Sequence, residues 1–263
     1  MMNRRLLLTA PAALLLPRPA AAVDRMPVAA TPISRMDTPW WRARHLAKLE
    51  EIKGKRVDLI WLGDSITQNW EKTGPEEWRN FAPIWQHFYG DRNALNLGFI
   101  GDTTAHLLWR MQNGELEGLR PKAAVILIGA NNMGRVHWNA PQTVAGIDAV
   151  VAEAQKRLPG TKLLLLSVLP SIRSKYVSRT TEAINQALAA RYGGGAVPGV
   201  TYVDVTKLFM KDGAVDRTQF LDDRLTPPDP PLHPTAQAQG RLAEAIEPAL
   251  AAMLGDKPKS RKP

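Results

Sequence analysis

Five short apolar runs, separated by longer segments with helical periodicity, constrain the fold of this 263-residue chain more than any other feature. Each run has the length of one strand and is rich in Leu or β-branched residues, with little alternation of apolar and polar positions. That pattern is typical of strands that are buried on both faces of a parallel sheet. The runs are residues 57–62, 94–97, 123–128, 162–168 and 200–205.

The segments around these runs predict helices with one apolar face. The last of them shows the pattern most clearly, because Leu242, Ile246, Leu250 and Leu254 recur at helical spacing. Alternation of strands and helices predicts an α/β fold, a three-layer α/β/α sandwich around a mainly parallel sheet of about five strands. The predicted helices are residues 40–52, 102–113, 143–157, 178–192 and 235–254.

The N-terminus has the three parts of a secretory signal. Arg4 and Arg5 precede the apolar segment 6–16, and small residues follow at 20–22. The apolar segment is too short to cross a bilayer core of about 30 Å as a helix. A membrane anchor and a disordered tail are the alternatives. We expect a cleaved signal, export to the periplasm or medium, and no stable membrane anchor afterwards; the arginine pair also permits twin-arginine export.

No internal repeat or second domain is visible in the remaining sequence. We therefore divide the chain into a signal peptide (1–22), an N-terminal extension (23–54), one globular domain of about 200 residues (55–254) and a basic tail (255–263). The tail is rich in Lys, Arg and Pro, so we expect it to be disordered.

Composition excludes several classes of function. The chain has no Cys, which rules out disulfides, thiol chemistry and thiolate metal sites. The net charge is +9, but the predicted signal and the tail carry most of the excess. The remaining basic residues are scattered and form no stripe interleaved with aromatic residues, so we expect no nucleic-acid partner.

Polar residues and glycines gather where the predicted strands end, and parallel sheets bind ligands at that edge. Gly63-Asp64-Ser65 follows the first strand, where Ser65 is either a helix N-cap or a nucleophile. Gly98 and Gly101 follow the second strand; they serve loop geometry, or Gly101 offers its backbone N–H to a bound oxygen.

Two further stretches complete the set. Asn131 and Asn132 follow the third strand, where Asn is common in turns, yet an Asn amide beside backbone donors also completes an oxyanion hole. His233 stands in the segment LHPT before the last helix. A lone histidine there would be an ordinary loop residue.

The four stretches GDSI, NLGFIGDTT, GANN and LHPT, in this order and spacing, resemble the GDSL/SGNH hydrolase superfamily. Residues 101–132 are especially similar to the α-subunit branch of platelet-activating-factor acetylhydrolases and its exported bacterial relatives. The resemblance covers roughly residues 55–252. It implies a flavodoxin-like sheet and serine esterase chemistry that needs no metal and no other cofactor.

By position, the resemblance implies that Ser65 is the nucleophile and His233 the general base. It implies an oxyanion hole of the Ser65 and Gly101 backbone N–H groups and the Asn131 side chain. The family usually has Asp three residues before the His, where this chain has Pro230. We expect Asp229 to orient His233, with a Ser–His dyad as the alternative.

The natural substrate is open at this stage. Exported relatives often remove acetyl groups from polysaccharides such as bacterial cellulose, so our first expectation is a small O-acyl ester on a carbohydrate or exopolysaccharide. One or two of the eight Trp residues could stack on sugar rings at the rim of the site. The alternatives are lipid or aryl esters, acyl transfer to a sugar, and a non-catalytic polysaccharide-binding or assembly factor. The sequence indicates no oligomeric state.

Overall fold

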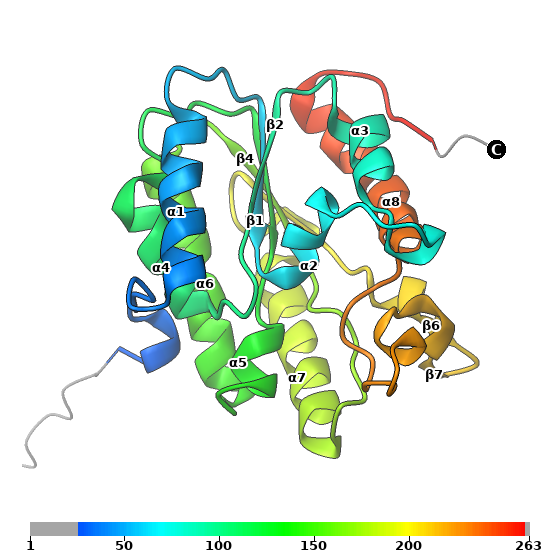
Figure 1. The fold of residues 1–263 in the computed structure, drawn as a ribbon. Coiled ribbons are helices and arrows are strands. Elements are labelled where there is room, and N and C mark those ends of the chain that lie inside the picture. Colours follow the sequence, from blue (N-terminus) through cyan, green and yellow to red (C-terminus); the bar gives the residue numbers. More distant parts are fainter. Residues whose placement is uncertain (1–25, 261–263) are drawn as a thin grey trace, which may run out of the picture.

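The fold is a three-layer α/β/α sandwich around one parallel sheet, as predicted (Figure 1). The computed structural model describes residues 26–260. The strand order is β2-β1-β3-β4-β5, and all four pairings are parallel. The strands are β1 (Leu59–Gly63), β2 (Ala94–Gly98), β3 (Ala123–Leu127), β4 (Lys162–Leu166) and β5 (Val200–Val203).

Helices cover both faces of the sheet. One face carries α1 (Pro39–Ile52), α4 (Thr104–Arg110), α6 (Ala140–Arg157) and α7 (Lys175–Tyr192), and the other carries α3 (Ala82–Tyr89) and α8 (Ala236–Leu254). Two short helices, α2 (Ser65–Gln68) and α5 (Ala130–Gly134), begin directly after β1 and β3. All five predicted strands and five predicted helices are therefore present.

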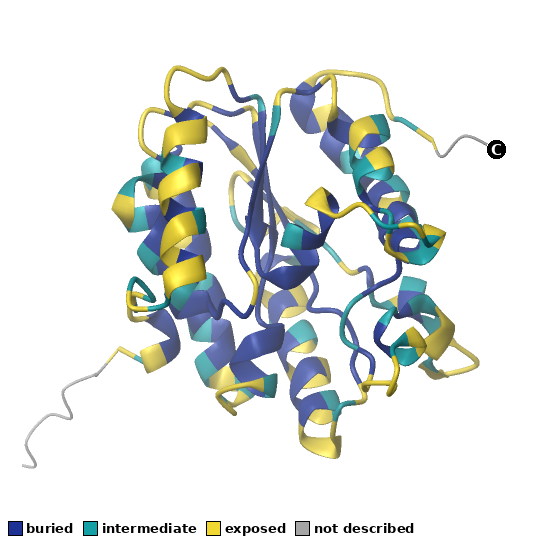
Figure 2. Ribbon diagram, viewed as in Figure 1, coloured by how far each residue is buried: buried dark blue, intermediate teal, exposed yellow. Residues whose placement is uncertain are grey.

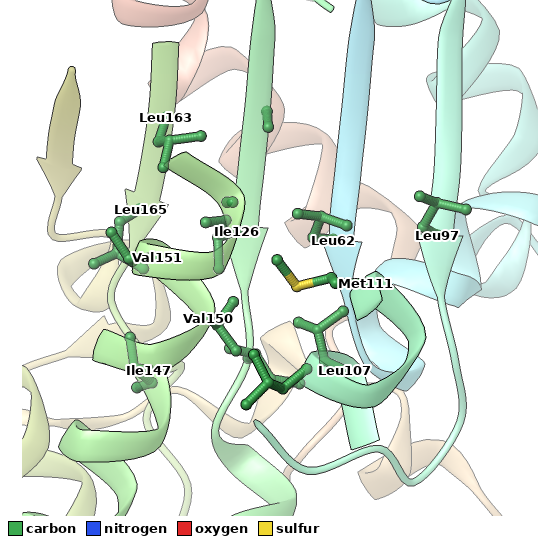
Figure 3. Close-up of a cluster of buried hydrophobic side chains, with 14 of the residues drawn as sticks. Leu62, Leu97, Leu107, Met111, Ile126, Ile147, Val150, Val151, Leu163 and Leu165 are labelled. Atoms are coloured by element: carbon green, nitrogen blue, oxygen red, sulfur yellow. The ribbon is translucent and has the colours of Figure 1, made fainter. Parts of the chain in front are cut away.

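Each face of the sheet has its own apolar core, because the central strands β1 and β3 are buried along their whole length, whereas the edge strand β5 is partly exposed (Figure 2). On the α4–α6 face, Leu62 and Ile126 meet Leu107, Met111 and Val150 (Figure 3). On the α3–α8 face, aromatic side chains dominate the contacts with the strands. Burial on two faces explains why the strands read as continuous apolar runs.

The structure adds elements that the sequence patterns did not predict. Helix α3 was missed, and so was the small antiparallel hairpin of β6 (Met210–Lys211) and β7 (Ala214–Val215). These elements are short: α3 has eight residues, and β6 and β7 have two each. Among residues 26–260, no helix is long and apolar enough to cross a membrane.

Residues 256–260 of the predicted tail make polar contacts with the domain. The Lys259 backbone N–H donates to Glu247 of α8 at 2.9 Å, and the Lys259 ammonium pairs with Asp91. Arg92 also pairs with Asp256 at 2.8 Å. One of the tail's cations, Lys259, thus finds a carboxylate on the domain. Residues 261–263, and the predicted signal peptide, lie outside the described residues.

The N-terminal extension packs closely on the domain. Trp41 of α1 is fully buried, and the Thr104 hydroxyl at the start of α4 donates to the Ala29 carbonyl at 2.8 Å. Arg35 donates to the Ile100 carbonyl at 3.0 Å, in the loop that follows β2. The extension therefore reaches the edge of the sheet where the candidate site lies.

Candidate active site

The turn after β1 places Ser65 at the first position of α2. Asp64, not Ser65, is the N-cap: its carboxylate accepts the Ile66 backbone N–H at 3.0 Å. The Ser65 hydroxyl is thus free of the capping role and lies 2.9 Å from His233 Nε2. Of the two sequence interpretations, N-cap and reactive hydroxyl, the geometry supports the second.

Gly63 makes this turn possible because the neighbouring chain leaves no room for a side chain. A Cβ at that position would lie 2.2 Å from the Thr67 hydroxyl and 2.5 Å from the Leu127 carbonyl oxygen. In the sheet, Gly63 is paired with Gly98 and with Leu127. The ends of β1, β2 and β3 therefore lie side by side, which brings their following loops together.

The loop after β2 presents a backbone donor to the same place. Gly101 has a φ of 75°, in the left-handed region that glycine adopts without strain. Its neighbours are fixed: Ile100 N–H donates to the Gln68 side chain at 2.8 Å, and Asp102 N–H to the Phe99 carbonyl at 3.2 Å. Among residues 26–260, no hydrogen bond takes up the Gly101 N–H.

Asn131 and Asn132 have different roles, although both follow β3. The Asn131 amide nitrogen donates to the Asp102 carbonyl at 3.0 Å and lies 3.3 Å from Asp64 Oδ2, so it faces the Ser65 turn. Asn132 turns toward α4, where it accepts the Thr104 N–H at 3.0 Å and donates to the Thr104 hydroxyl. Asn131 thus belongs to the site, and Asn132 anchors the start of α4.

The carboxylate against His233 comes from Asp222. Asp222 Oδ1 lies 2.7 Å from His233 Nδ1, and Oδ2 accepts the backbone N–H groups of Leu232 and His233. An ionised carboxylate can only accept hydrogen bonds, so Nδ1 carries a proton and Nε2 is left as the acceptor of the Ser65 hydroxyl. Ser65, His233 and Asp222 form one connected chain of hydrogen bonds.

The prediction that Asp229 orients His233 is therefore wrong. Asp229 is exposed, and its contact is with Asp222: its backbone N–H donates to the Asp222 carbonyl at 2.9 Å. Asp222 stands eleven positions before His233, whereas the family pattern has the acid three residues before the His. The four prolines between them were the available signal, because they mark a surface loop.

The two carboxylates of the site have opposite electrostatic environments. Burial raises the pKa of Asp222, but hydrogen bonds from His233 and the charge of its ring outweigh burial, so the pKa is lowered from its ordinary value. Burial raises the pKa of Asp64 to about 6, against the opposing Ile66 hydrogen bond. Asp222 is thus held ionised beside the imidazole, whereas the charge of Asp64 is disfavoured.

The structure thus brings four predicted residues together, Ser65, Gly101, Asn131 and His233, and replaces the fifth, Asp229, by Asp222. A hydroxyl bonded to an oriented imidazole, beside a Gly101 backbone N–H that has no acceptor among residues 26–260, can attack a carbonyl carbon and hold the resulting oxyanion. A nucleophile, a base and oxyanion donors are the groups that acyl transfer requires.

Comparison with known proteins agrees with this chemistry. The GDSL-like Lipase/Acylhydrolase family matches residues 61–241. Human platelet-activating factor acetylhydrolase IB subunit alpha1 is 31% identical over 224 residues, which cover 80% of this chain and 90% of that protein.

Two solved structures share the fold at low sequence identity. A GDSL-like lipase from Bacteroides thetaiotaomicron has a TM-score of 0.58 at 18% identity, covering 80% of this chain and 97% of its own. A carbohydrate esterase family 3 protein from Talaromyces cellulolyticus has a TM-score of 0.56 at 16% identity, covering 76% and 99%. The chain belongs to the GDSL-like Lipase/Acylhydrolase family and is a carboxylic ester hydrolase.

Proposed function

We propose that Ser65 is the nucleophile of this esterase, His233 its general base and Asp222 the carboxylate that orients the imidazole. The observation that carries this proposal is the pair of contacts from His233, 2.9 Å to Ser65 Oγ and 2.7 Å to Asp222 Oδ1. His233 takes the Ser65 proton as Oγ attacks the ester carbonyl, and returns it to the leaving alcohol. Water, deprotonated by His233, then releases the acid from the acyl-enzyme.

The oxyanion hole consists of the backbone N–H groups of Ser65 and Gly101 and the Asn131 amide. Ser65 is the first residue of α2, where the helix N–H groups have no intrahelical acceptor. Asn131 donates one amide hydrogen to the Asp102 carbonyl at 3.0 Å and the other, at 3.3 Å, to Asp64 Oδ2, so the amide is oriented before substrate binds and the oxyanion replaces Asp64 as the acceptor of the second hydrogen. Fixed donors of this kind stabilise the tetrahedral intermediate without reorganisation.

The substrate class that we propose is a small O-acyl, chiefly acetyl, ester on a carbohydrate. The carbohydrate esterase among the solved structures supports this choice. A second support is Trp78, a half-buried side chain that lines two cavities of about 330 and 290 Å³. Leu221 and Leu225 line one cavity and Arg224 the other, so both adjoin the segment that carries Asp222. The guanidinium groups of Arg79 and Arg224 lie over the Trp78 ring, 5.5 and 6.0 Å from its centroid, so a sugar ring that stacks there would displace one of them.

A second candidate is an ester on a lipid. The relative reported above at 31% identity is a subunit of platelet-activating factor acetylhydrolase, which supports an acetyl ester carried by a lipid alcohol. Both candidates share the acetyl group and differ in the alcohol. We favour the carbohydrate because the proposed export would bring the enzyme to exopolysaccharides, bacterial cellulose production included. Export itself remains a proposal, based on the N-terminal sequence.

One set of assays tests the site and the substrate together. The protein is incubated with aryl esters of graded acyl length, with acetylated polysaccharides and with an acetyl ether phospholipid, and released acid is measured. We expect acetate to be released fastest, and from polysaccharide more efficiently than from lipid. Preference for long acyl chains would contradict the acetyl assignment, and activity on lipid alone would favour the second candidate.

Trp78→Ala separates the sugar contact from the chemistry. We expect it to lower kcat/KM on acetylated polysaccharide about tenfold, as loss of a stacking contact worth roughly 1 kcal/mol or more. Turnover of a small aryl acetate should stay near wild type. Equal loss on both substrates would contradict a role of Trp78 in sugar binding.

A further inference from the structure

A buried ionic cluster lies directly behind the proposed oxyanion hole. Arg110, Asp102 and Glu115 are each 0% exposed. The Arg110 Nε donates to Asp102 Oδ2 at 2.8 Å, and its Nη1 pairs with Glu115. Glu115 also contacts His45 of α1, with 2.9 Å between Oε1 and Nδ1. Every member thus has a partner inside the protein.

The Arg110 guanidinium connects the two loops that build the site. Its Nη2 donates to the Gly63 carbonyl at 3.2 Å, at the start of the turn that carries Ser65. Through Asp102 it reaches the other loop, because the Asp102 backbone carbonyl accepts the Asn131 amide and Gly101 is the preceding residue. One side chain therefore touches both the nucleophile turn and the residue that orients an oxyanion donor.

The Asp102 carboxylate is fixed by donors from three separate segments. Trp41 Nε1 donates at 2.8 Å, Arg35 at 3.1 Å and Arg110 at 2.8 Å. Arg35 also holds the Ile100 carbonyl, next to Gly101. Two of these donors belong to the N-terminal extension. The N-terminal extension thus binds one oxygen of the Asp102 carboxylate, Oδ1, and Arg110 at the end of α4 binds the other, Oδ2.

We propose that Arg110 and the Asp102 carboxylate are positioning residues, which hold the Asn131 amide and the Gly101 N–H in register with Ser65. The inference rests on the proposed catalytic roles of those three groups. Buried ion pairs contribute little net stability compared with apolar residues, so stability alone is a weak reason for this cluster. Geometry is the stronger reason, since small displacements of reacting groups cost about 10²-fold in rate.

A second buried arginine offers a matched control. Arg92 is 4% exposed and pairs with Glu247 through two hydrogen bonds. It precedes β2, however, and therefore lies at the amino ends of the strands, away from the loops that carry the site. Arg110→Lys and Arg92→Lys both keep the charge and lose the planar fork. We expect both to lower the melting temperature. Only Arg110→Lys should lower kcat of the folded enzyme on an aryl acetate, by about 10- to 100-fold with KM little changed.

Two readouts separate positioning from general damage. Affinity for a trifluoromethyl ketone, whose serine adduct carries an oxyanion, should fall in Arg110→Lys and not in Arg92→Lys. In an Asn131→Ala background, Arg110→Lys should lower kcat much less than in the wild type, since both changes act on the same donor. The midpoint of the acidic limb of the pH–rate profile should not move, because His233 and Asp222 are untouched.

A milder pair of variants serves if Arg110→Lys does not fold. Trp41→Phe removes one hydrogen bond to Asp102 and keeps an aromatic ring. Its control is Trp61→Phe, because the buried Trp61 Nε1 has no hydrogen-bond partner among the residues that the structure describes. We expect Trp41→Phe to lower kcat about 3- to 10-fold, and Trp61→Phe to change it less than 2-fold, when both are folded.

The inference is overturned if folded Arg110→Lys keeps wild-type kcat, or if Arg92→Lys loses as much. With the milder pair, equal kcat in Trp41→Phe and Trp61→Phe overturns it. Failure of the proposed function looks different: Ser65→Ala would then remain active, and an active-serine phosphonate would not label Ser65. If Ser65 is labelled and both arginine variants behave alike, only the positioning role is wrong.

Discussion

The two segments that supply the proposed nucleophile and its base are built in different ways. The turn after β1 is held by backbone geometry: a glycine without room for a side chain, the Asp64 cap, and a helix that begins at Ser65. The segment from Asp222 to His233 has no regular frame of that kind. Asp222 makes most of the segment's hydrogen bonds, because it accepts from Leu225, Asp229, Leu232 and His233. The Ser171 hydroxyl and the Leu221 N–H hold the carbonyls of Pro231 and His233.

The two segments therefore give different roles to their aspartates, Asp64 and Asp222. Asp64 shapes a turn and Asp222 both shapes a loop and faces the imidazole. The turn should therefore tolerate loss of the reactive hydroxyl, whereas the loop should not tolerate loss of its carboxylate. The variants below test this contrast, from the largest expected effect to the smallest.

Ser65→Ala should abolish esterase turnover, with a loss of at least about 10⁵-fold in kcat, as in a serine hydrolase without its nucleophile. Stability should change little, because Asp64 and not Ser65 caps α2. Turnover of an aryl acetate and thermal unfolding measure the two effects. A phosphonate should label Ser65 in the wild type. Retained turnover, or labelling at another residue, would end the serine mechanism.

Asp222→Asn should lower kcat by about 10⁴-fold, the loss that follows when the carboxylate of a triad becomes an amide. Asp229→Asn is the matched control on the same loop, and we expect it to stay within about 2-fold of wild type because its side chain is exposed. Steady-state kinetics of both variants decide the matter. A larger loss in Asp229→Asn than in Asp222→Asn would return the acid role to Asp229.

Asn131→Ala should lower kcat by about 10²- to 10³-fold, the cost of removing one oxyanion donor, with KM little changed. Asn132→Ala is its neighbour control. Because Asn132 binds Thr104 and not the Ser65 turn, that variant should act mainly on stability. If both variants lower kcat equally at a temperature where both are folded, the distinction between them is wrong.

The parts of the molecule that follow regular rules could be predicted from sequence. Strands buried on both faces leave continuous apolar runs, and long amphipathic helices leave a periodic pattern, so the five strands of the main sheet and its five long helices were predicted in their chain order, although α3 and the small hairpin were missed. Because the carboxyl ends of parallel strands lie at the same end of the sheet, the sequence also predicted that the loops of Ser65, Gly101 and Asn131 lie together.

The acid could not be predicted in the same way, because a longer loop separates it from its partner. Counting back three residues from His233 leads to Pro230, and the nearest acid is Asp229, but Asp222, eleven positions before His233, lies beside the ring. Nor does any pattern show that Trp41 and Arg35 reach Asp102. Contacts between segments so far apart in the chain depend on tertiary packing alone.

The pH dependence of stability gives the smallest effect and contrasts the two aspartates directly. Asp64 has a folded pKa of about 6, above the ordinary value of about 3.9 in the unfolded chain. Its burial therefore destabilises the protein above pH 6 by about 3 kcal/mol, and that penalty disappears as the pH falls toward 4. Asp64→Asn keeps a capping side chain, so its stability relative to wild type should increase from pH 4 to pH 7.

Asp222 should show the opposite sign in the same experiment. Its folded pKa lies below the unfolded value, so its charge stabilises the protein above pH 4, and this contribution is lost as the pH falls through the folded pKa. Asp222→Asn should therefore lose stability relative to wild type as the pH rises from acid toward 7. Denaturant unfolding of both variants at several pH values measures the two slopes. Slopes of the same sign would mean that the two carboxylates do not differ in environment, because only opposite pKa shifts give opposite slopes.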